Sequence, residues 1–172
     1  MQRTIVLVVV VAALVAACGR GGPAAGNSGE PALDPTTFAG LSARPAGLAM
    51  PDPDLTPGDV LPVGPAEICV KGFSSKTRDV STKTKNAVYV SYGVSSHPTG
   101  AYEVDHLIPL ELGGSNDVKN LWPEPANPRP GFHEKDQLEN LLHDLVCSGR
   151  VDLQTAQHAI ATDWFAAWVT YR

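Results

Sequence analysis

The residues of this sequence that are best suited to chemistry are an adjacent acid and imidazole, Asp105-His106. Hydrolysis of a phosphodiester needs a base that activates water and a cation that neutralises charge on the phosphoryl oxygen. An imidazole suits the first task, and a carboxylate is a suitable ligand for Mg²⁺ or Mn²⁺. A further group should hold the other nitrogen of the imidazole and so fix its tautomer. The pair therefore indicates the centre of a phosphodiesterase site.

The elements that must position this pair are a strand, a glycine-rich turn and a returning strand. Residues 102–108 alternate and are rich in strand formers, which predicts a strand that ends near the pair. Neighbouring side chains of an ideal strand point to opposite faces, so both reach one cleft only if the backbone twists at the strand end. Residues 113–117 form a turn cluster, residues 120–123 return as a short extended piece, and residues 123–130 hold four prolines and are expected to be a loop.

Helices are expected on both sides of this segment. Residues 135–148 place apolar side chains on one face before Gly149, and Asp152 is placed to cap a second helix from 153 to about 170. Residues 81–92 fit either a strand or a helix capped by Ser81, and we favour the helix. Residues 67–70 predict a short strand. The side chains expected in the core are Leu138, Leu141, Leu142, Val146, Ala156, Ile160, Trp164, Trp168 and Trp122.

The chain begins as an exported protein does. Arg3 precedes an apolar run, Ile5 to Ala17, that is too short to span a bilayer core of about 30 Å and is typical of a signal peptide. The run ends in Val15 to Gly19, which resembles a bacterial lipobox and implies cleavage before Cys18 and lipid attachment to its sulfur. We therefore expect residues 1–17 to be a signal peptide and the chain to be anchored to the outer face of a membrane, or secreted if the lipobox is not used.

Two cysteines remain for the folded part of the chain, Cys69 and Cys147. An even number of cysteines in an exported protein favours a disulfide, which would close a loop of about 78 residues and stabilise the fold by roughly 4 kcal/mol. Two unrelated buried thiols are the alternative. Residues 18–65 are rich in Gly, Ala and Pro and lack apolar periodicity, which predicts a disordered tether. Composition changes near Ala66, so the expected domain spans 66–172.

The run from Asp105 to Gly114, followed by Asn120-Leu121, resembles the HNH endonuclease family of ββα-metal nucleases. The continuation through Pro123, with Lys135-Asp136 and Glu139, resembles an exported bacterial subset of HNH-like proteins, and the similarity extends from about residue 69 to 164. The resemblance implies an α+β fold. Its ββα-metal core would be a short β-hairpin with a glycine-rich loop and a following helix, with one further helix at the C-terminus.

The resemblance also implies roles for individual residues. His106 would be the general base, Asp105 would bind one divalent metal ion (Mg²⁺ or Mn²⁺, with Zn²⁺ as an alternative), and Asn120 would orient the base and steady the loop. A second metal ligand is expected early in the following helix. His133 matches by type, although it lies four residues beyond the short family spacing. Three alternatives remain open: Asp136, Glu139 and His143, of which Glu139 could instead pair with Lys135, a contact worth about 0.2–0.5 kcal/mol.

Charge does not favour a nucleic acid partner for the domain as a whole. The chain has a net charge of −5, whereas a domain that grips many phosphates is expected to be basic. One stretch, residues 71–85, holds five basic side chains and a single acid. It could guide a phosphate backbone to the site or form a solvated face. Its basic residues are Lys71, Lys76, Arg78, Lys83 and Lys85.

Two functions are consistent with these features. The first is a metal-dependent endonuclease that cuts DNA or RNA outside the cytoplasm, with no clear protein partner. The second is a non-catalytic binding or structural module of the cell envelope that keeps an HNH-like scaffold.

Overall fold

The structure, a computed structural model, describes residues 43–172. The predicted signal peptide, the lipidation of Cys18 and the predicted tether as far as residue 42 lie outside the described residues. No helix in the range 43–172 combines the length and the apolar character that crossing a membrane requires.

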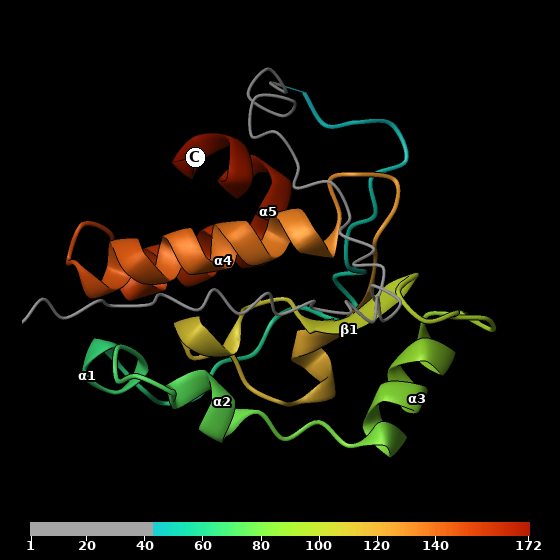
Figure 1. Cartoon of the computed structure of the whole chain (residues 1–172), viewed down its shortest axis with the longest axis horizontal. Coiled ribbons are helices and arrows are strands. Elements are labelled where there is room, and N and C mark those ends of the chain that lie inside the picture. Colours follow the sequence, from blue (N-terminus) through green and yellow to red (C-terminus); the bar gives the residue numbers. More distant parts are fainter. Residues whose placement is uncertain (1–42) are drawn as a thin grey trace, which may run out of the picture. The chain divides into compact units, whose positions relative to one another are not determined.

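The described chain is a mixed α+β fold with one β-hairpin among helices (Figure 1). Three short helices precede the hairpin, two 3-10 turns lie within its connection, and two longer helices follow it. The elements in chain order are α1 (Pro65–Ile68), α2 (Phe73–Thr77), α3 (Thr82–Ser91), β1 (Tyr102–His106), η2 (Leu110–Leu112), η3 (Val118–Asn120), β2 (Leu121–Pro125), α4 (Phe132–Cys147) and α5 (Leu153–Tyr171).

The hairpin pairs β1 antiparallel to β2, with Asp105 opposite Trp122 and His106 opposite Leu121. The predicted strand is thus present, and the returning strand extends to Pro125, into the segment that was expected to be loop. Trp122 is buried in the main core with side chains of α4 and α5, as predicted. Leu121 packs in a second apolar cluster with Val88 of α3. Helices therefore cover both faces of the hairpin.

Helix α4 begins at Phe132, three residues before the predicted start, because Gly131 and Glu134 cap it. The Gly131 N–H donates to the Glu134 carboxylate at 2.7 Å, which satisfies a backbone donor before the first turn. Leu138, Leu142 and Val146 of this helix are buried as predicted, whereas Leu141 is only half-buried.

Helix α5 is capped by Asp152, whose carboxylate accepts from the Thr155 N–H at 3.1 Å. It was expected to be continuous, but the backbone leaves helical geometry at Asp163. The Asp163 carboxylate accepts from the Ala166 N–H at 3.0 Å, which is the bond of an N-terminal cap. Asp163 therefore ends one helical segment and caps the next.

The predicted strand at residues 67–70 is wrong. This stretch contains the end of the short helix α1, in which Pro65 occupies the first turn and the Gly64 N–H donates to Glu67 at 2.8 Å. An apolar run as short as this one does not distinguish a strand from a helix, and the cap formed by Gly64 and Glu67 favours the helix. The favoured helix at residues 81–92 is confirmed, with Ser81 accepting from the Thr84 N–H at 3.1 Å.

The predicted tether does not extend to residue 65. Leu48, Met50 and Val63 pack against the main core, and Val60 pairs with Gly114 in an isolated antiparallel bridge. Prolines in this segment prevent regular structure but leave enough backbone donors to bond to the glycine-rich loop. The compact part of the chain therefore includes residues 48–63 as well as the predicted domain.

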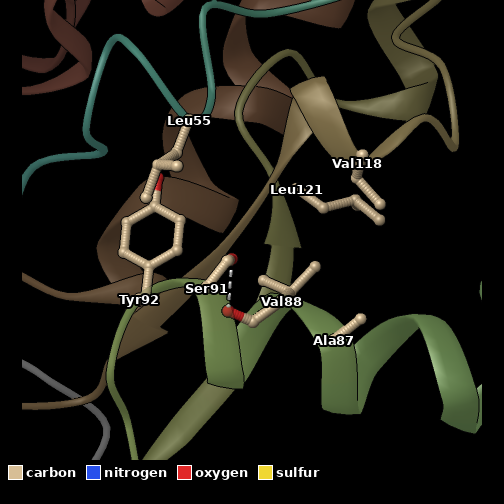
Figure 2. A pocket seen from close by; sticks show the side chains of 7 residues that line it. All are labelled: Leu55, Ala87, Val88, Ser91, Tyr92, Val118 and Leu121. Carbon is tan, nitrogen blue, oxygen red and sulfur yellow. Dashed lines mark hydrogen bonds between the residues drawn. The ribbon is translucent and has the colours of Figure 1, made fainter.

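An apolar pocket of about 230 Å³ lies on the α3 side of the hairpin (Figure 2). The only polar side chains that line it are those of Ser91 and Tyr92. Ser91 donates to the Val88 carbonyl at 2.9 Å, and the Tyr92 hydroxyl lies 2.6 Å from that of Thr56. The pocket holds no acid or imidazole, and we assign it no chemistry. Its lining is Leu55, Ala87, Val88, Ser91, Tyr92, Val118 and Leu121.

Candidate functional site

The Asn120 side chain holds the glycine-rich loop that links the two strands. Its Nδ2 donates to the carbonyls of Ile108 and Ser115, both at 2.9 Å, and its Oδ1 accepts from the Ile108 N–H at 2.9 Å and from the Asp59 N–H at 3.4 Å. All four hydrogen-bonding positions of the amide are thus used, three of them within the loop. The bracing that was expected of Asn120 is therefore present, and a backbone group from the upstream segment adds to it.

The loop can close this tightly only because Gly114 has no side chain. A Cβ at Gly114 would lie 1.8 Å from the carbonyl oxygen of Ile108 and 2.8 Å from Nδ2 of Asn120. Gly113 adopts a positive φ of 77°, which glycine tolerates best. The two glycines thus bring the backbone against the Asn120 amide.

The His106 ring is oriented by Asn116 in the same loop. The ring Nε2 lies 3.1 Å from Oδ1 of Asn116, and Nδ2 of Asn116 donates to the Thr77 carbonyl at 2.8 Å. Because the second contact directs the amide oxygen at the ring, Nε2 must carry the proton and Nδ1 must hold the lone pair. Nδ1 is buried and makes no hydrogen bond with any described residue.

The surroundings of His106 keep its imidazole neutral. Burial lowers its pKa, and this effect outweighs the opposing influences of the Asn116 hydrogen bond and the Asp105 carboxylate. The side chain is only 1% exposed. A neutral ring with a free Nδ1 lone pair is the protonation state that a general base requires, although neighbouring groups must move before a water can reach it.

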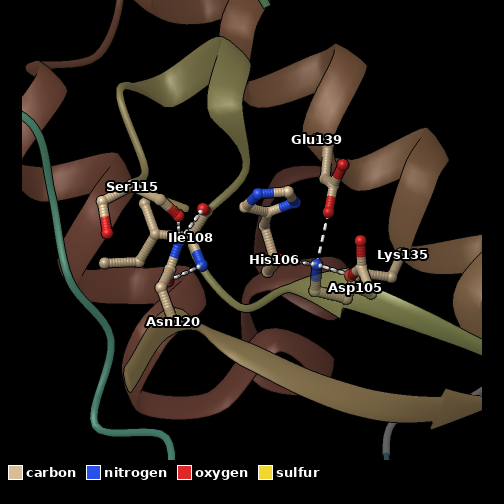
Figure 3. A network of polar contacts seen from close by, with 7 residues as sticks. All are labelled: Asp105, His106, Ile108, Ser115, Asn120, Lys135 and Glu139. Carbon is tan, nitrogen blue, oxygen red and sulfur yellow. Dashed lines mark hydrogen bonds and ion pairs between the residues drawn. The ribbon is translucent and has the colours of Figure 1, made fainter. Parts of the chain in front are cut away.

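Asp105 does not face an open cleft. Its Oδ2 accepts from the Lys135 ammonium at 2.6 Å, and the same ammonium donates to Glu139 and, at 2.8 Å, to the His106 carbonyl (Figure 3). Lys135 is 0% exposed and uses all three of its N–H donors. The expected pair between Lys135 and Glu139 is therefore present, and it is part of a buried ionic centre.

The protonation of this centre follows from burial and from the ammonium. Burial favours a neutral Asp105, but the charge and hydrogen bond of Lys135 outweigh it and lower the pKa of Asp105. Burial likewise opposes a charged Lys135, and the surrounding carboxylates, Asp105 first, raise its pKa. Burial raises the pKa of Glu139, against the influence of Lys135. Asp105 and Lys135 thus form a charged pair in the interior.

Glu124 adds a buried acid whose pKa is raised. It lies on β2 opposite Glu103 and is 0% exposed. Burial raises its pKa well above the usual value, and the negative charge of Asp105 adds to this effect. Asp105 is near enough to influence its protonation, yet neither carboxyl oxygen of Glu124 makes a well-formed hydrogen bond with a described residue. We therefore regard Glu124 as a protonated neighbour of the ion pair.

The four candidates for the second metal ligand lie in different places along α4. His133 is exposed and packs against the Phe132 ring, and Asp136 is exposed on the next turn. Burial raises the pKa of Asp136, and the charge of Asp105 adds to this, so these two acids influence each other. Glu139 is bound to Lys135. His143 lies two helical turns beyond Lys135, near the end of α4, where its Nε2 is 3.4 Å from the sulfur of Cys147.

The predicted disulfide between Cys69 and Cys147 is present. It joins the residue after α1 to the last residue of α4. His143 lies beside it, and Cys69, His143 and Cys147 form a group that could hold a metal ion, with ligand atoms all within 4.8 Å of one another. Among the described residues this is the only such group of three, so no comparable set is formed around Asp105.

The five basic residues of the 71–85 stretch are exposed on α2, on α3, between these helices and, for Lys71, in the turn before α2. Arg78 is the one that influences the site, because its charge helps to lower the pKa of His106. It also lowers the pKa of Glu103, against the effect of burial, together with Lys85. Arg78 and Lys85 therefore face the strand that carries Asp105 and His106.

Sequence reasoning missed two side chains at this site, Glu124 and Asn116, and it did not place Lys135 beside Asp105. A buried lysine leaves little sequence signal, because an apolar pattern assigns lysine to the exposed face. The only sequence signal for Lys135 was the presence of acids within one helical turn of it, Glu134, Asp136 and Glu139.

A comparison of the chain with protein-family models, with curated proteins and with solved structures finds no match in any of the three.

Proposed function

We propose that this chain is an HNH-type endonuclease that hydrolyses phosphodiester bonds of DNA or RNA, with His106 as the general base. The observation that carries the proposal is the state of the His106 ring. Asn116 holds Nε2, burial keeps the ring neutral, and Nδ1 has a lone pair without a partner. In the proposed reaction, Nδ1 accepts the proton of the water that attacks the phosphorus.

Asn120 is a positioning residue in this proposal. It is not proposed to contact water or substrate, but three of its four hydrogen bonds fix the loop from Ile108 to Ser115, and Asn116 follows Ser115 directly. Displacement of a catalytic group by about 1 Å can reduce a rate roughly 100-fold. The brace would therefore act through the placement of the imidazole.

The acids around Asp105 fit a metal ion only in part. Oδ2 of Asp105 is already held by Lys135, and no set of three ligands surrounds it among the described residues. A Mg²⁺ site, however, needs only one or two carboxylates when water and substrate phosphates complete it. In the proposal those carboxylates are Asp105 and Asp136, with His133 on the adjacent turn. A cation bound there would neutralise charge on the phosphoryl group.

The basic surface beside the site would hold the polynucleotide backbone. Arg78 and Lys85 both lower the pKa of Glu103 on β1 against the effect of burial. Lys76 on α2, Lys83 on α3 and Lys71 just before α2 extend the basic surface. Contacts of this kind bind phosphates without regard to base sequence. We therefore propose cleavage without strong sequence preference, with affinity that falls steeply as salt is raised.

An extracytoplasmic location is part of the proposal. The disulfide between Cys69 and Cys147 supports it, because disulfides persist in oxidising compartments. The apolar N-terminal run and the lipobox-like residues around Cys18 support a lipid anchor on the outer face of a membrane.

The test is a cleavage assay with the full chain, plasmid DNA and a structured RNA, each with Mg²⁺, Mn²⁺ or Zn²⁺ and with a chelator. We expect His106→Ala to lower the cleavage rate at least about 100-fold, the low end of the usual contribution of a general base. The matched control is His158→Ala, which removes an exposed histidine of α5 and is expected to leave the rate unchanged. Equal rates for His106→Ala and the parent chain would overturn the assignment of the base.

The second candidate function is a non-catalytic envelope module with the same scaffold. The observation that favours it is the closed site, in which His106 is 1% exposed and Lys135 occupies the acidic centre. Nucleic acid that binds with a steep salt dependence but stays intact with every metal would support this function. The nuclease proposal would then be wrong, while the account of the fold would stand.

A further inference from the structure

The C-terminal end of helix α4, which carries the disulfide, brings together side chains that could bind a metal ion. Cys147 is the last residue of α4, His143 lies one helical turn before it, and Cys69 follows α1. The Cα atoms of the two cysteines are 5.6 Å apart, and Nε2 of His143 is 3.4 Å from Sγ of Cys147. Two sulfurs and one imidazole nitrogen thus converge on one point of the surface.

These separations fit a tetrahedral zinc site. With Zn–S bonds of about 2.3 Å and Zn–N bonds of about 2.0–2.1 Å, sulfur and nitrogen ligands of one ion lie about 3.6 Å apart. The observed 3.4 Å between His143 and Cys147 is close to this value. Both cysteines are exposed, so their side chains have room to rotate once the bond between them is broken. A water or a ligand from solvent would complete four-fold coordination.

The surroundings of His143 suit a ligating imidazole once its Nε2 turns from the Ile68 carbonyl, which lies 3.3 Å away, toward the ion. Its Nδ1 lies 4.0 Å from a carboxylate oxygen of Asp144, and the charge of His143 lowers the pKa of Glu111 against the effect of burial. Carboxylates near the second nitrogen of a ligating histidine orient the ring and increase its basicity. The group is therefore a possible site with supporting acids, and it is distinct from the site around His106.

We propose that, when the disulfide is reduced, Cys69, His143 and Cys147 bind one soft divalent metal ion such as Zn²⁺. The reductant is a dithiol. It transfers two electrons and two protons to the disulfide, which becomes two thiols, while the dithiol becomes a disulfide. The metal ion then displaces the two thiol protons and accepts an electron pair from each thiolate and from Nε2 of His143. The oxidised chain cannot bind the ion, because its sulfurs are bonded to each other.

The consequence is that α1 stays joined to the end of α4 in both redox states. In the oxidised chain the disulfide makes the connection, and in the reduced chain the metal ion makes it. The same helix carries Lys135 and Glu139 of the ionic centre, so the connection also supports the placement of that centre. This inference does not depend on nuclease activity.

The experiment is a titration with Co²⁺, whose thiolate complexes absorb in the near ultraviolet and, when tetrahedral, in the visible. The full chain is used in a Cys18→Ser background, so that the third cysteine supplies no thiol. We expect the reduced chain to bind one Co²⁺ with both sets of bands, the oxidised chain to show neither, and Zn²⁺ to displace the Co²⁺. His143→Ala should weaken binding at least about 10-fold.

The matched control is His158→Ala, an exposed histidine of α5 that should leave the affinity unchanged. A second measurement covers the case in which the reduced chain is unstable: Zn²⁺ should then raise its melting temperature or restore its far-ultraviolet circular dichroism, and it should do neither for the oxidised chain. Absence of thiolate bands in the reduced chain, or equal affinity of His143→Ala and the parent chain, would overturn the proposal.

Discussion

Two buried polar regions on either side of His106 are built on opposite principles. On one side, Asn120 is a neutral amide that bonds only to backbone groups, and every one of its positions is used. On the other side, Lys135 is a charge that bonds to two acids and one carbonyl, with a third acid, Glu124, left without a well-formed hydrogen bond. The amide brace is complete in itself, whereas the ionic centre depends on a balance of charge.

This difference shows how the two regions should respond to substitution. Removal of the amide exposes backbone groups that need hydrogen bonds, at a cost that hardly depends on pH. Removal of a member of the ionic centre leaves unbalanced charge in the interior, which is more costly and changes with protonation.

Lys135→Met should be the most destabilising change. It keeps the length of the side chain but leaves Asp105 and Glu139 buried without their cation, and loss of one partner of a buried ion pair costs about 3–5 kcal/mol. The measurement is the free energy of unfolding in denaturant. Lys119→Met, at an exposed position, is the control and should change stability by less than about 0.5 kcal/mol. A loss below about 1 kcal/mol for Lys135→Met would show that the ammonium does not hold the centre.

Asn120→Ala should cost about 2–4 kcal/mol, because it leaves the N–H and carbonyl of Ile108 and the carbonyl of Ser115 without partners at a buried site. The loss should be similar across the pH range over which the chain is folded, in contrast to changes at the ionic centre. Asn140→Ala is the control, since its amide is exposed and bonds only to the Asp136 carbonyl. A strongly pH-dependent loss would contradict the distinction drawn here.

Glu124→Gln should replace the neutral acid by a neutral amide and change the pH profile of stability. The pKa of Glu124 is raised in the folded chain, so its contribution is fully present below about pH 4.5 and is lost as pH rises through the folded-state pKa. Relative to the parent chain, the variant should therefore gain stability as pH rises. The measurement is unfolding at a series of pH values. A constant difference between the two chains would indicate that folding does not raise the pKa of Glu124.

Asn116→Ala should have the smallest effect on stability, about 1–2 kcal/mol. It removes the contacts of the amide with the His106 ring, the Thr77 carbonyl and the Asp79 N–H, but all three lie at partly exposed positions. Because the Asn116 bond raises the pKa of His106 against burial, its loss should lower that pKa further. The fixed tautomer should also be lost, which nitrogen chemical shifts of the ring would show. A ring that keeps its proton on Nε2 in the variant would mean that another group sets the tautomer.

The bracing by Asn120 could be predicted from the sequence, whereas the buried position of Lys135 between Asp105 and Glu139 could not. Asn120 was expected to brace the loop because the resemblance to HNH nucleases implies that role, and its hydrogen bonds to the loop are present. The disulfide followed from the number of cysteines. Lys135 was missed as the central group because its position depends on acids from two strands and one helix, and no local pattern combines them.

Local patterns failed elsewhere for equally specific reasons. Residues 67–70, expected to be a short strand, are the last two residues of helix α1 and the turn that follows it, since a proline in the first turn and the Glu67 cap outweigh a short apolar run. Helix α5 breaks at Asp163, whose side chain caps the second segment. The packing of residues 48–63 depends on acceptors that lie more than fifty residues later in the chain, such as the Gly113 carbonyl bonded by the Leu61 N–H at 2.8 Å.

The packing of this upstream segment has a mechanical consequence. The N–H groups of Gly58 and Leu61 bond to the carbonyls of Lys119 and Gly113, and the Asp59 N–H bonds to the Asn120 amide itself. A pull on the chain from before residue 44 would load α5 through the ion pair between Arg44 and Asp163, and a load carried past residue 57 would reach the glycine-rich loop. Force that passes the Arg44 contact would therefore be felt by the residues that hold His106 in place.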